Sequence, residues 1–522
     1  MTEKLRRLSF RNILLLFILG PLLVAGLCQL AKAGQYLFFR GDSTFPESAV
    51  VQTALWSKAS GRIYPALDQS PYTPAPYGPL FYASLTAVAK LADADLDHLL
   101  VYGRIVVFSA FLLLLFGAYS WERRQKLAVA IACFSPALIL SQIDFEAWNA
   151  SVRPDLPALL VSFAAFFVLT TAPISWRRVA LAGCLCGIAG LLKQSFIALP
   201  LSVLFWLLTT RQKRAALVFL ASIAAVGIAV LFPLALRHEP FAREMLLARY
   251  SPVSFPGALR LLKTDFLNYP GQIVLVGLGV LGLQRMDPKV VSARRLISTY
   301  FLLAWITNFY TAMAPGASVN AFLESWLITS ICAPFALLDL AETWEQAGVT
   351  VRRALLLLWI SIMVVDLNSW RMLVSQRPPS EFGKVALLMH GHRVLSDIPY
   401  IATHGDQPEL LDPSVNHYLE IAGQWSAQPV LQELRSGRFD YVVMGLNGGR
   451  PRQWRGLTLF STSILAQVQA DYQPMCVTDR FAVFVPRLRE IVGKAADFQK
   501  AGCRAPFPAD AGIELLQDTQ QR

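Results

Sequence analysis

Charged residues are scarce in this 522-residue sequence: Asp, Glu, Lys and Arg make up 16% of it, against 55% for hydrophobic residues. Globular proteins carry nearer a quarter charged residues. Hydrophobic stretches long enough to cross a bilayer, or nearly so with tilt, recur from residue 12 to about residue 370. We expect a multi-pass α-helical membrane protein with about eleven transmembrane helices, at approximately 12–31, 100–120, 127–143, 156–172, 179–192, 195–210, 215–236, 271–284, 296–312, 325–340 and 353–370.

Nucleotide-binding motifs are also missing. The sequence has neither a Gly-rich phosphate loop of the Walker type nor a dinucleotide-binding fingerprint, which disfavours a nucleotide-driven pump. Its six histidines form no convincing metal-binding set, because only His390 and His392 lie close together in the sequence. There is no internal repeat and no low-complexity tract.

The net charge of +12 could suggest a nucleic acid partner, but the positions of the basic residues argue against one. Clusters of Lys and Arg lie at every second junction between hydrophobic stretches, from Lys4–Arg11 through Arg123–Lys126 to Arg352–Arg353. This alternation is the positive-inside rule of membrane proteins. It predicts a cytoplasmic N-terminus and, with an odd number of spans, an extracytoplasmic C-terminus.

Two domains are expected. Residues 1–370 would form the transmembrane domain, with an external loop at 32–99 that is unusually long. Residues 371–522 return to a globular composition, and alternating short strands and helices predict a small extracytoplasmic α/β domain. We expect strands at 399–402, 441–444 and 481–485 and helices at 415–422 and 429–436.

Two of the seven cysteines, Cys476 and Cys503, fall in this predicted domain. An oxidising compartment would allow a disulfide between them, although two unpaired thiols are an alternative. The other five lie in hydrophobic stretches, where cysteine behaves as a small apolar residue.

The long first loop contains two acids, Asp42 and Glu47, followed by a cluster of Pro and Tyr residues that includes Tyr64 and Tyr77. Both acids could simply be solvated loop residues. Long loops with such a composition more often carry function, so we interpret the two acids as candidate catalytic carboxylates.

Later external junctions carry further polar residues. Asp155 could cap the fourth span and Arg153 could neutralise it or anchor the interface. Alternatively Arg153 binds phosphate, because guanidinium matches phosphate geometry. Lys193, next to Gln194, could snorkel to the interface or could contact an anionic lipid head.

Asn320 and Glu324 are four residues apart and would share one face of the tenth span. A carboxylate that enters a hydrophobic span needs a partner or a purpose. Glu324 could therefore pair with Arg153 or Lys193, or could bind a sugar hydroxyl.

Taken in order, these residues resemble the motifs of the GT-C superfamily of integral-membrane glycosyltransferases, in particular bacterial members related to protein O-mannosyltransferases and to lipid A aminoarabinose transferases. Such proteins carry an acid in the first external loop, then Gly-x-x-Tyr, Tyr-x-Pro, Arg-x-Asp, Lys-Gln and Asn-x-x-x-Glu elements. The matching positions here are Asp42 or Glu47, Gly61–Tyr64, Tyr77–Pro79, Arg153–Asp155, Lys193–Gln194 and Asn320–Glu324. Together they span residues 1–370.

The resemblance implies a glycosyltransferase of the bacterial plasma (inner) membrane that inverts the anomeric carbon. Its donor would be a polyprenyl-phosphate sugar, and its acceptor a hydroxyl of a glycan, lipid or protein on the extracytoplasmic face. Asp42 or Glu47 would be the base, Arg153, Lys193 and Gln194 would bind the donor phosphate, and Tyr64, Tyr77, Asp155, Asn320 and Glu324 would contact substrate. Superfamily members differ in their use of a divalent cation, and the sequence leaves this open.

Two other functions are compatible with a polytopic chain. One is a transporter or flippase of lipid-linked sugars, which would more naturally show internal two-fold symmetry and interrupted spans. The other is a non-catalytic membrane scaffold whose external domain binds a partner. Sugar transfer by the purified protein distinguishes these functions.

Overall fold

The computed structural model describes residues 2–43, 47–68, 72–142, 145, 148–246, 253–286, 293–314, 317–346, 348–350, 353, 359–360, 381–405, 411, 413–447, 450–454, 457–487 and 498. The chain divides into two compact units. The helical unit comprises Met1–Leu37, Arg104–Pro233 and Val253–Arg377, and the loop–sheet unit comprises Phe38–Gly103, Leu234–Pro252 and Pro378–Arg522. The second unit thus combines most of the predicted first external loop with the C-terminal segment.

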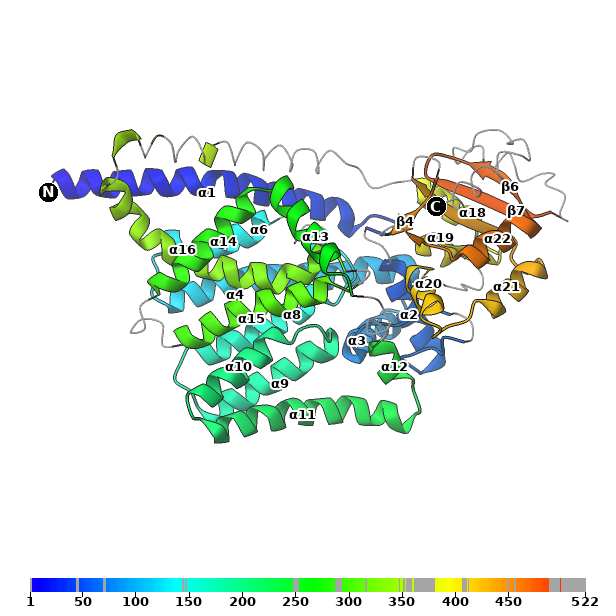
Figure 1. Ribbon diagram of the computed structural model, residues 1–522, viewed down its shortest axis with the longest axis horizontal. Helices are drawn as coiled ribbons and strands as arrows, with labels where there is room; N and C mark the ends of the chain where they lie inside the picture. The colour runs from blue at the N-terminus through cyan, green and yellow to red at the C-terminus, as the bar shows by residue number, and fades with distance from the viewer. Residues whose placement is uncertain are drawn as a thin grey trace. The chain divides into compact units, whose positions relative to one another are not determined.

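The helical unit is built from apolar helices of different lengths (Figure 1). They are α1 (Thr2–Leu37), α4 (Leu96–Arg124), α5 (Val129–Ala132), α6 (Phe134–Ser141), α8 (Asp155–Thr170), α9 (Trp176–Leu192), α10 (Ala198–Thr209), α11 (Lys213–Leu236), α13 (Phe255–Asn268), α14 (Gly271–Arg285), α15 (Arg294–Ala312), the short 3₁₀ helix η2 (Val319–Phe322) and α16 (Leu323–Gln346). The first turns of α4 and the last residues of α11 belong to the loop–sheet unit.

Three helical segments among the described residues are long and apolar enough to cross a membrane: Leu96–Arg124, Lys213–Leu236 and Val319–Ala336. The pair α13 and α14, bent by 102°, would make a fourth if it is one span. Helices lie at the first ten predicted positions, and most of the eleventh, 353–370, lies outside the described residues. The apolar helical architecture is confirmed, and the count of eleven spans stays a prediction.

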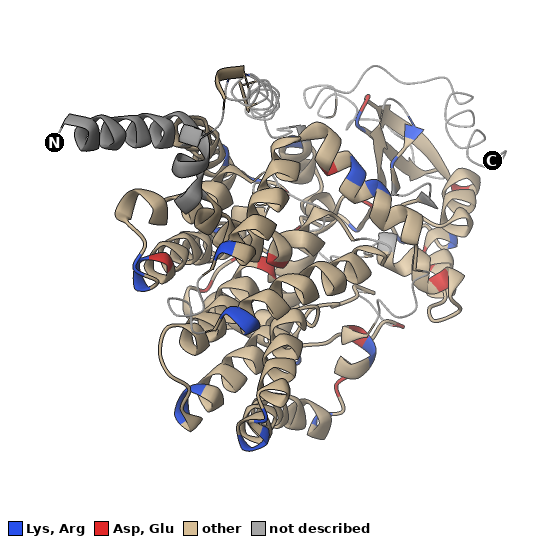
Figure 2. Cartoon of the chain, turned by 60° about the vertical axis from the view of Figure 1, so that its left-hand side comes forward, with Lys and Arg blue, Asp and Glu red and all other residues tan. Residues whose placement is uncertain are grey.

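The surface of α11 is suited to lipid. Leu217, Ile228 and Phe232 are more than half exposed, which is unfavourable in water. Figure 2 shows that charged residues of the helical unit gather mainly near helix ends and leave most helix middles uncharged. A bilayer would satisfy both features, because its core accepts apolar side chains and its faces accept charge.

Small residues allow helices of this unit to pack closely. A Cβ at Gly282 of α14 would lie 1.9 Å from the carbonyl oxygen of Cys332 in α16, and one at Gly183 of α9 would lie 2.6 Å from the carbonyl oxygen of Phe219 in α11. Glycine is therefore required at both contacts. Close backbone approach through small residues is typical of helix pairs in membranes, where van der Waals packing drives association.

The loop–sheet unit has two parts that are distant in the sequence. The first loop supplies α2 (Glu47–Ser60) and α3 (Pro79–Leu91), and the segment after α11 supplies α12 (Phe241–Met245). The C-terminal segment forms α18 (Glu381–Leu388), β1 (Val394–Ser396), α19 (Pro399–Ala402), α20 (Pro413–Ile421), α21 (Gln428–Arg435), β2 (Tyr441–Asn447), β3 (Arg450–Pro451), β4 (Gln453–Trp454), β5 (Leu457–Thr458), α22 (Thr462–Asp471), β6 (Tyr472–Val477) and β7 (Phe481–Pro486).

The C-terminal sheet has the order β1-β2-β7-β6. The pair β1–β2 is parallel, with Leu395 opposite Val442, whereas β2–β7 and β6–β7 are antiparallel. A parallel pair requires a crossover, and α19, α20 and α21 lie in that connection. The expected small α/β fold is therefore present.

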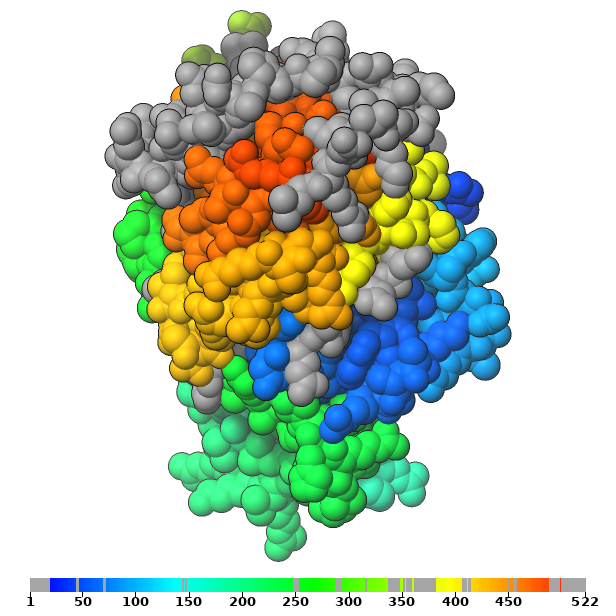
Figure 3. Space-filling view, turned by 90° about the vertical axis from the view of Figure 1, so that its right-hand side faces the viewer, coloured from blue at the N-terminus to red at the C-terminus, as the bar shows by residue number. Residues whose placement is uncertain are grey.

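Apolar residues of the first loop enter the core of this unit. Leu67 and Tyr72 cluster with Leu411, Trp425 and further buried residues of the C-terminal segment. The indole of Trp425 also donates to the carbonyl oxygen of Leu67 over 2.9 Å. In Figure 3 the blue surface of the first loop adjoins the yellow and orange surface of the C-terminal segment. The first loop is thus an integral part of a folded unit.

Most of the secondary structure expected in the C-terminal segment is confirmed: strands at 441–444 and 481–485 are β2 and β7, and helices at 415–422 and 429–436 are α20 and α21. The expected strand at 399–402 is wrong, because these residues form the helical turn α19. Pro399 occupies the first helical position, which suits its fixed φ. Four buried residues are too few for periodicity to separate a strand from a helix.

Cys476, at the end of β6, is disulfide-bonded. Cys503, the partner expected from the sequence, lies outside the described residues. Cys28, Cys133, Cys184, Cys186 and Cys332 are free thiols in the helical unit.

Candidate active site

Asp42, the first candidate base, lies just before α2 in the loop–sheet unit. Its Oδ1 accepts a hydrogen bond from the backbone N–H of Ser48 over 2.7 Å and a second, short one from the Ser48 hydroxyl. Ser48 is in the first turn of α2, where backbone N–H groups lack helical partners and the helix dipole favours an anion. These two bonds fix the orientation of the half-buried carboxylate.

Glu47, the second candidate, is the first residue of α2 and is completely buried. Its Oε2 accepts hydrogen bonds from the backbone N–H of Ser43 at 2.9 Å and from the Ser43 hydroxyl at 2.8 Å. The carboxylate therefore closes the turn that precedes α2. Of the two acids, Asp42 is the more accessible.

Tyr64 and Tyr77 form the aromatic interior of the first loop. The Tyr64 hydroxyl donates to the carbonyl oxygen of Tyr77 over 2.9 Å, and both rings pack against Tyr82 of α3, with centroids 6.1 and 6.2 Å away. Burial, and after it the nearby charges of Glu244 and Glu239, raise the pKa of the Tyr64 phenol. Tyr64 is therefore a neutral hydrogen-bond donor that holds the loop.

Glu239 and Glu244, which the sequence analysis missed, anchor the same loop from the segment that includes α12. Oε2 of Glu239 accepts from the backbone N–H groups of Ile63 at 2.8 Å and Tyr64 at 3.1 Å. Oε2 of Glu244 accepts from the N–H of Ala75 at 2.9 Å. Both acids lie in a predicted external loop. No local sequence pattern connects them to the backbone N–H groups that they bind, which are about 170 residues earlier in the chain.

Glu244 makes the stability of the loop–sheet unit depend on pH. Burial raises the pKa of its carboxyl from 4.5 to about 7, although the Ala75 hydrogen bond and Arg243 oppose the shift. A raised pKa means that the stabilising contribution is complete below pH 4.5 and is lost as the pH rises to about 7. We expect the melting temperature of Glu244→Gln, relative to that of the unmodified protein, to increase as the pH is raised from 5 to 8. Thermal unfolding at a series of pH values measures this difference. A difference in melting temperature that is constant over this range would contradict the assignment.

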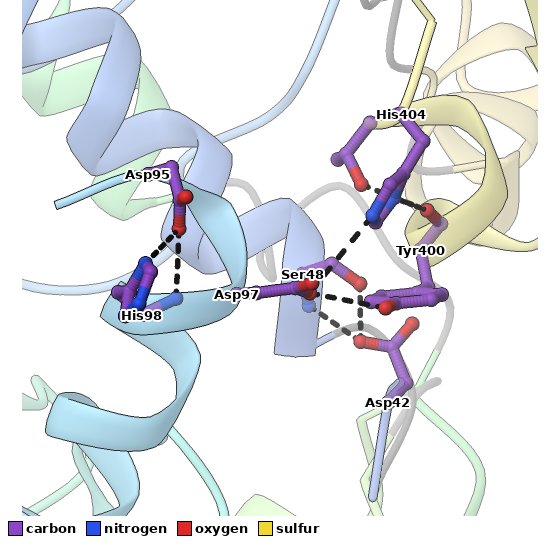
Figure 4. Close-up of polar contacts among 8 residues, drawn as sticks. Asp42, Ser48, Asp95, Asp97, His98, Tyr400 and His404 are labelled. Carbon is purple, nitrogen blue, oxygen red and sulfur yellow. Dashed lines mark hydrogen bonds and ion pairs between the residues drawn. The ribbon is translucent and has the colours of Figure 1, made fainter. Parts of the chain in front are cut away.

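A second polar cluster joins α4 to α19 within the loop–sheet unit (Figure 4). Asp95 precedes α4 and accepts from the backbone N–H of His98 over 2.9 Å, which caps the helix and places Asp97 in its first turn. The Tyr400 hydroxyl donates to Oδ1 of Asp97 over 3.0 Å. His404 directs Nδ1 to the Tyr400 carbonyl oxygen at 2.8 Å and Nε2 to Asp97 at 3.9 Å.

Asp42 lies beside this cluster. Figure 4 shows its carboxylate next to the Tyr400 ring, with Ser48 between it and Asp97. Burial, then Asp97, and then the charge of Asp42 raise the pKa of the Tyr400 phenol, which therefore stays protonated and donates. A strand was expected at 399–402, and no role was predicted for Ser48, Asp97, Tyr400 or His404.

In the helical unit, Asp155 links two of the residues predicted to contact substrate. Its Oδ1 accepts a short hydrogen bond from Nζ of Lys193 and one from Nδ2 of Asn320 at 2.8 Å. Asp155 begins α8, Lys193 is the C-cap residue of α9, and Asn320 lies in η2. The Asp155 side chain is 1% exposed and that of Lys193 is 12% exposed, so this is a nearly buried ion pair.

The remaining predicted donor-binding residues are Arg153 and Gln194. The guanidinium of Arg153 lies 4.9 Å from the ring centroid of Trp148, a cation–π contact, and the residue is 8% exposed. Gln194 follows Lys193 and is half-buried. Lys193 forms an ion pair with Asp155, the carboxylate that Arg153 was suggested to neutralise.

Glu324 lies in the first turn of α16 and is 3% exposed. Its Oε1 accepts from the Tyr300 hydroxyl over 2.9 Å, so a phenol of α15 satisfies this oxygen. Lys193, one of its two suggested partners, pairs with Asp155 instead. Asn320 thus contacts Asp155 of α8, and Glu324 contacts Tyr300 of α15.

Two buried cations of the helical unit were not considered in the sequence analysis. Arg104 of α4 is fully buried and donates from Nη1 to the Tyr36 carbonyl oxygen over 3.0 Å, and Lys32 of α1 lies 5.0 Å from the Tyr36 ring centroid. The sequence could have drawn attention to both residues, because each is a charged residue within or next to a predicted span. Within the described residues, no three or more His, Cys, Asp or Glu side chains gather closely enough to hold a metal ion.

No protein-family model matches the chain, and no curated protein matches it by sequence.

Solved structures show the likeness of fold. The chain is similar to apo ArnT from Cupriavidus metallidurans with a TM-score of 0.56 and 13% identity, over 90% of this chain and 97% of that one. It is similar to the same protein bound to undecaprenyl phosphate with a TM-score of 0.54, at the same identity and coverage. It also resembles the Archaeoglobus fulgidus oligosaccharyltransferase with a TM-score of 0.51 and 10% identity, over 88% of this chain and 72% of that one. The resemblance to the GT-C fold is confirmed.

Proposed function

We propose that this protein is a glycosyltransferase of the bacterial plasma membrane that moves a sugar from a polyprenyl-phosphate donor to an acceptor hydroxyl on the extracytoplasmic face. The observation that carries the proposal is the pair of polar sites in this fold: a fixed carboxylate at Asp42 and a nearly buried cation at Lys193. The similarity to ArnT, solved with undecaprenyl phosphate, supports a lipid phosphate as the carrier.

The donor phosphate would bind at Lys193, with Arg153 and Gln194. An ammonium group has three donors, and Asp155 accepts from one of them, so the Lys193 ammonium retains capacity for phosphate oxygens. Asp155, itself held by Asn320, acts as a positioning residue that keeps Lys193 in one conformation. Cations stabilise the charge that develops on a departing phosphate.

Asp42 would be the general base. The acceptor oxygen attacks the anomeric carbon while the bond from that carbon to the phosphate oxygen breaks, and the phosphate keeps the electron pair. Asp42 takes the acceptor's proton, and attack opposite the leaving group inverts the anomeric carbon. Ser48 binds Oδ1 and so orients the carboxylate, whereas Glu47 is buried and held by Ser43.

The test is transfer by the purified full-length protein. A radiolabelled polyprenyl-phosphate hexose would be incubated with hexyl β-D-glucoside, a serine-containing peptide and water as acceptors. We expect the labelled sugar to leave the lipid and appear, with inverted configuration, on an acceptor. Movement of intact donor across vesicles with no breakage of its sugar–phosphate bond would instead support a transporter and contradict the proposal.

A further inference from the structure

The polar cluster around α19 adds to the proposed function, because it places residues of the C-terminal segment next to Asp42. Its residues belong to one unit: Asp42, Ser48 and Asp97 come from the first part of the chain, and Tyr400 and His404 from the last. We propose that Tyr400 and His404, with Asp97, form the subsite that recognises the acceptor hydroxyl and presents it to Asp42. The inference rests on the proposed function and adds residues to it.

The geometry of His404 carries the argument. A carbonyl oxygen only accepts, so Nδ1, 2.8 Å from the Tyr400 carbonyl oxygen, bears a hydrogen, and Nε2 is turned toward Asp97. The distance of 3.9 Å from Nε2 to Oδ1 of Asp97 is too long for a hydrogen bond. With a hydrogen on both ring nitrogens, Nε2 can donate to the oxygen of an acceptor hydroxyl, and that hydroxyl keeps its single hydrogen for a carboxylate.

Exposure and position are consistent with this role. The Asp97 side chain is 31% exposed and that of His404 is 15% exposed, so a ligand can reach them. Tyr400 is 2% exposed and donates to Asp97, which makes it a positioning residue. Its proximity to Asp42, seen in Figure 4 and in the effect of that charge on the pKa of Tyr400, places the subsite beside the candidate base.

The local fold holds α19 firmly. The helix follows β1 directly, and the Ile398 N–H donates to the Ser396 hydroxyl over 3.0 Å. Asp397, which is 1% exposed, accepts from the Gly445 N–H at 2.5 Å and so links β1 to β2. α19 also packs against α2, the helix that orients Asp42. The C-terminal sheet thus fixes Tyr400 and His404 on a rigid support, as a specificity site requires.

The experiment compares Tyr400→Phe and His404→Gln in the full-length protein with hexyl β-D-glucoside and the serine peptide as acceptors. Tyr472→Phe is the matched control, because its buried hydroxyl donates to the Phe439 carbonyl oxygen over 3.2 Å in the same unit. We expect each test variant to raise the acceptor KM roughly 10-fold, the loss of one hydrogen bond to a charged group, and to raise the share of donor lost to water. The donor KM should not change.

Three results would overturn the inference: an unchanged acceptor KM in both test variants, an increase in the donor KM instead, or an equal increase in Tyr472→Phe. If Tyr400→Phe does not fold, His404→Gln alone decides. Failure of the proposed function looks different, since the unmodified protein would then release no sugar from the donor to any acceptor or to water.

Discussion

Asp42→Asn is expected to lower the rate of sugar transfer by about 10²–10⁴-fold, the usual contribution of a general base, while the donor KM stays the same. The amide is close in size to the carboxylate and can keep an oxygen toward Ser48, so the fold should persist. Initial rates with the labelled donor measure the effect. Ser48→Ala removes the hydroxyl bond but keeps the backbone bond, and should give an intermediate loss.

Two variants make the assignment of the base specific. Asp68→Asn changes an exposed acid of the same loop and should leave transfer near its original rate. Glu47→Gln weakens the buried contact with Ser43, so we expect a lower melting temperature with nearly normal activity in the folded fraction. Normal transfer by Asp42→Asn, together with a folded but inactive Glu47→Gln, would assign the base to Glu47.

Lys193→Gln should have the second large effect, on both stability and donor binding. It leaves the Asp155 carboxylate buried without its cation, and breaking a buried pair in this way costs about 3–5 kcal/mol. It also removes the ammonium proposed to bind phosphate, which should weaken undecaprenyl phosphate binding by roughly 10–100-fold. Thermal unfolding and equilibrium binding in detergent measure the two effects separately.

The double variant Asp155→Asn plus Lys193→Gln separates structure from binding. Removing both charges should restore most of the melting temperature, because no uncompensated charge stays buried. Lipid binding should remain weak. Lys213→Gln, an exposed lysine at the start of α11, is the control and should change neither quantity. Full lipid affinity in the double variant would show that Lys193 has only a structural role.

Local pattern predicted the helices of the helical unit well, because long apolar runs in this composition have few other folds. Asp155, Lys193 and Asn320 were also predicted to be site residues, but the hydrogen bonds among them were not predicted. Lys193 lies 38 residues and Asn320 165 residues after Asp155 in the sequence. Only the packing of the helices decides which cation lies at which carboxylate.

The loop–sheet unit was harder to predict from the sequence. Glu239 and Glu244 bind backbone N–H groups of the first loop. Such contacts do not depend on the side chains of the donating residues, so the sequence does not reveal them. Tyr400 was overlooked because its four-residue buried segment resembles a strand. His404 was considered only as a possible metal ligand. The first loop was interpreted as a connector that carries chemistry, whereas Leu67 and Tyr72 are part of a hydrophobic core.

This shared core has a consequence for biogenesis. During synthesis the ribosome makes Leu67 and Tyr72 more than 300 residues before Trp425, so the first loop emerges with no partner for its apolar side chains. The loop–sheet unit can fold only after the last quarter of the chain is complete, and exposed apolar surface invites misassembly in the interval. A chain truncated after Arg377 would keep its spans and lose the partners that fold its first loop.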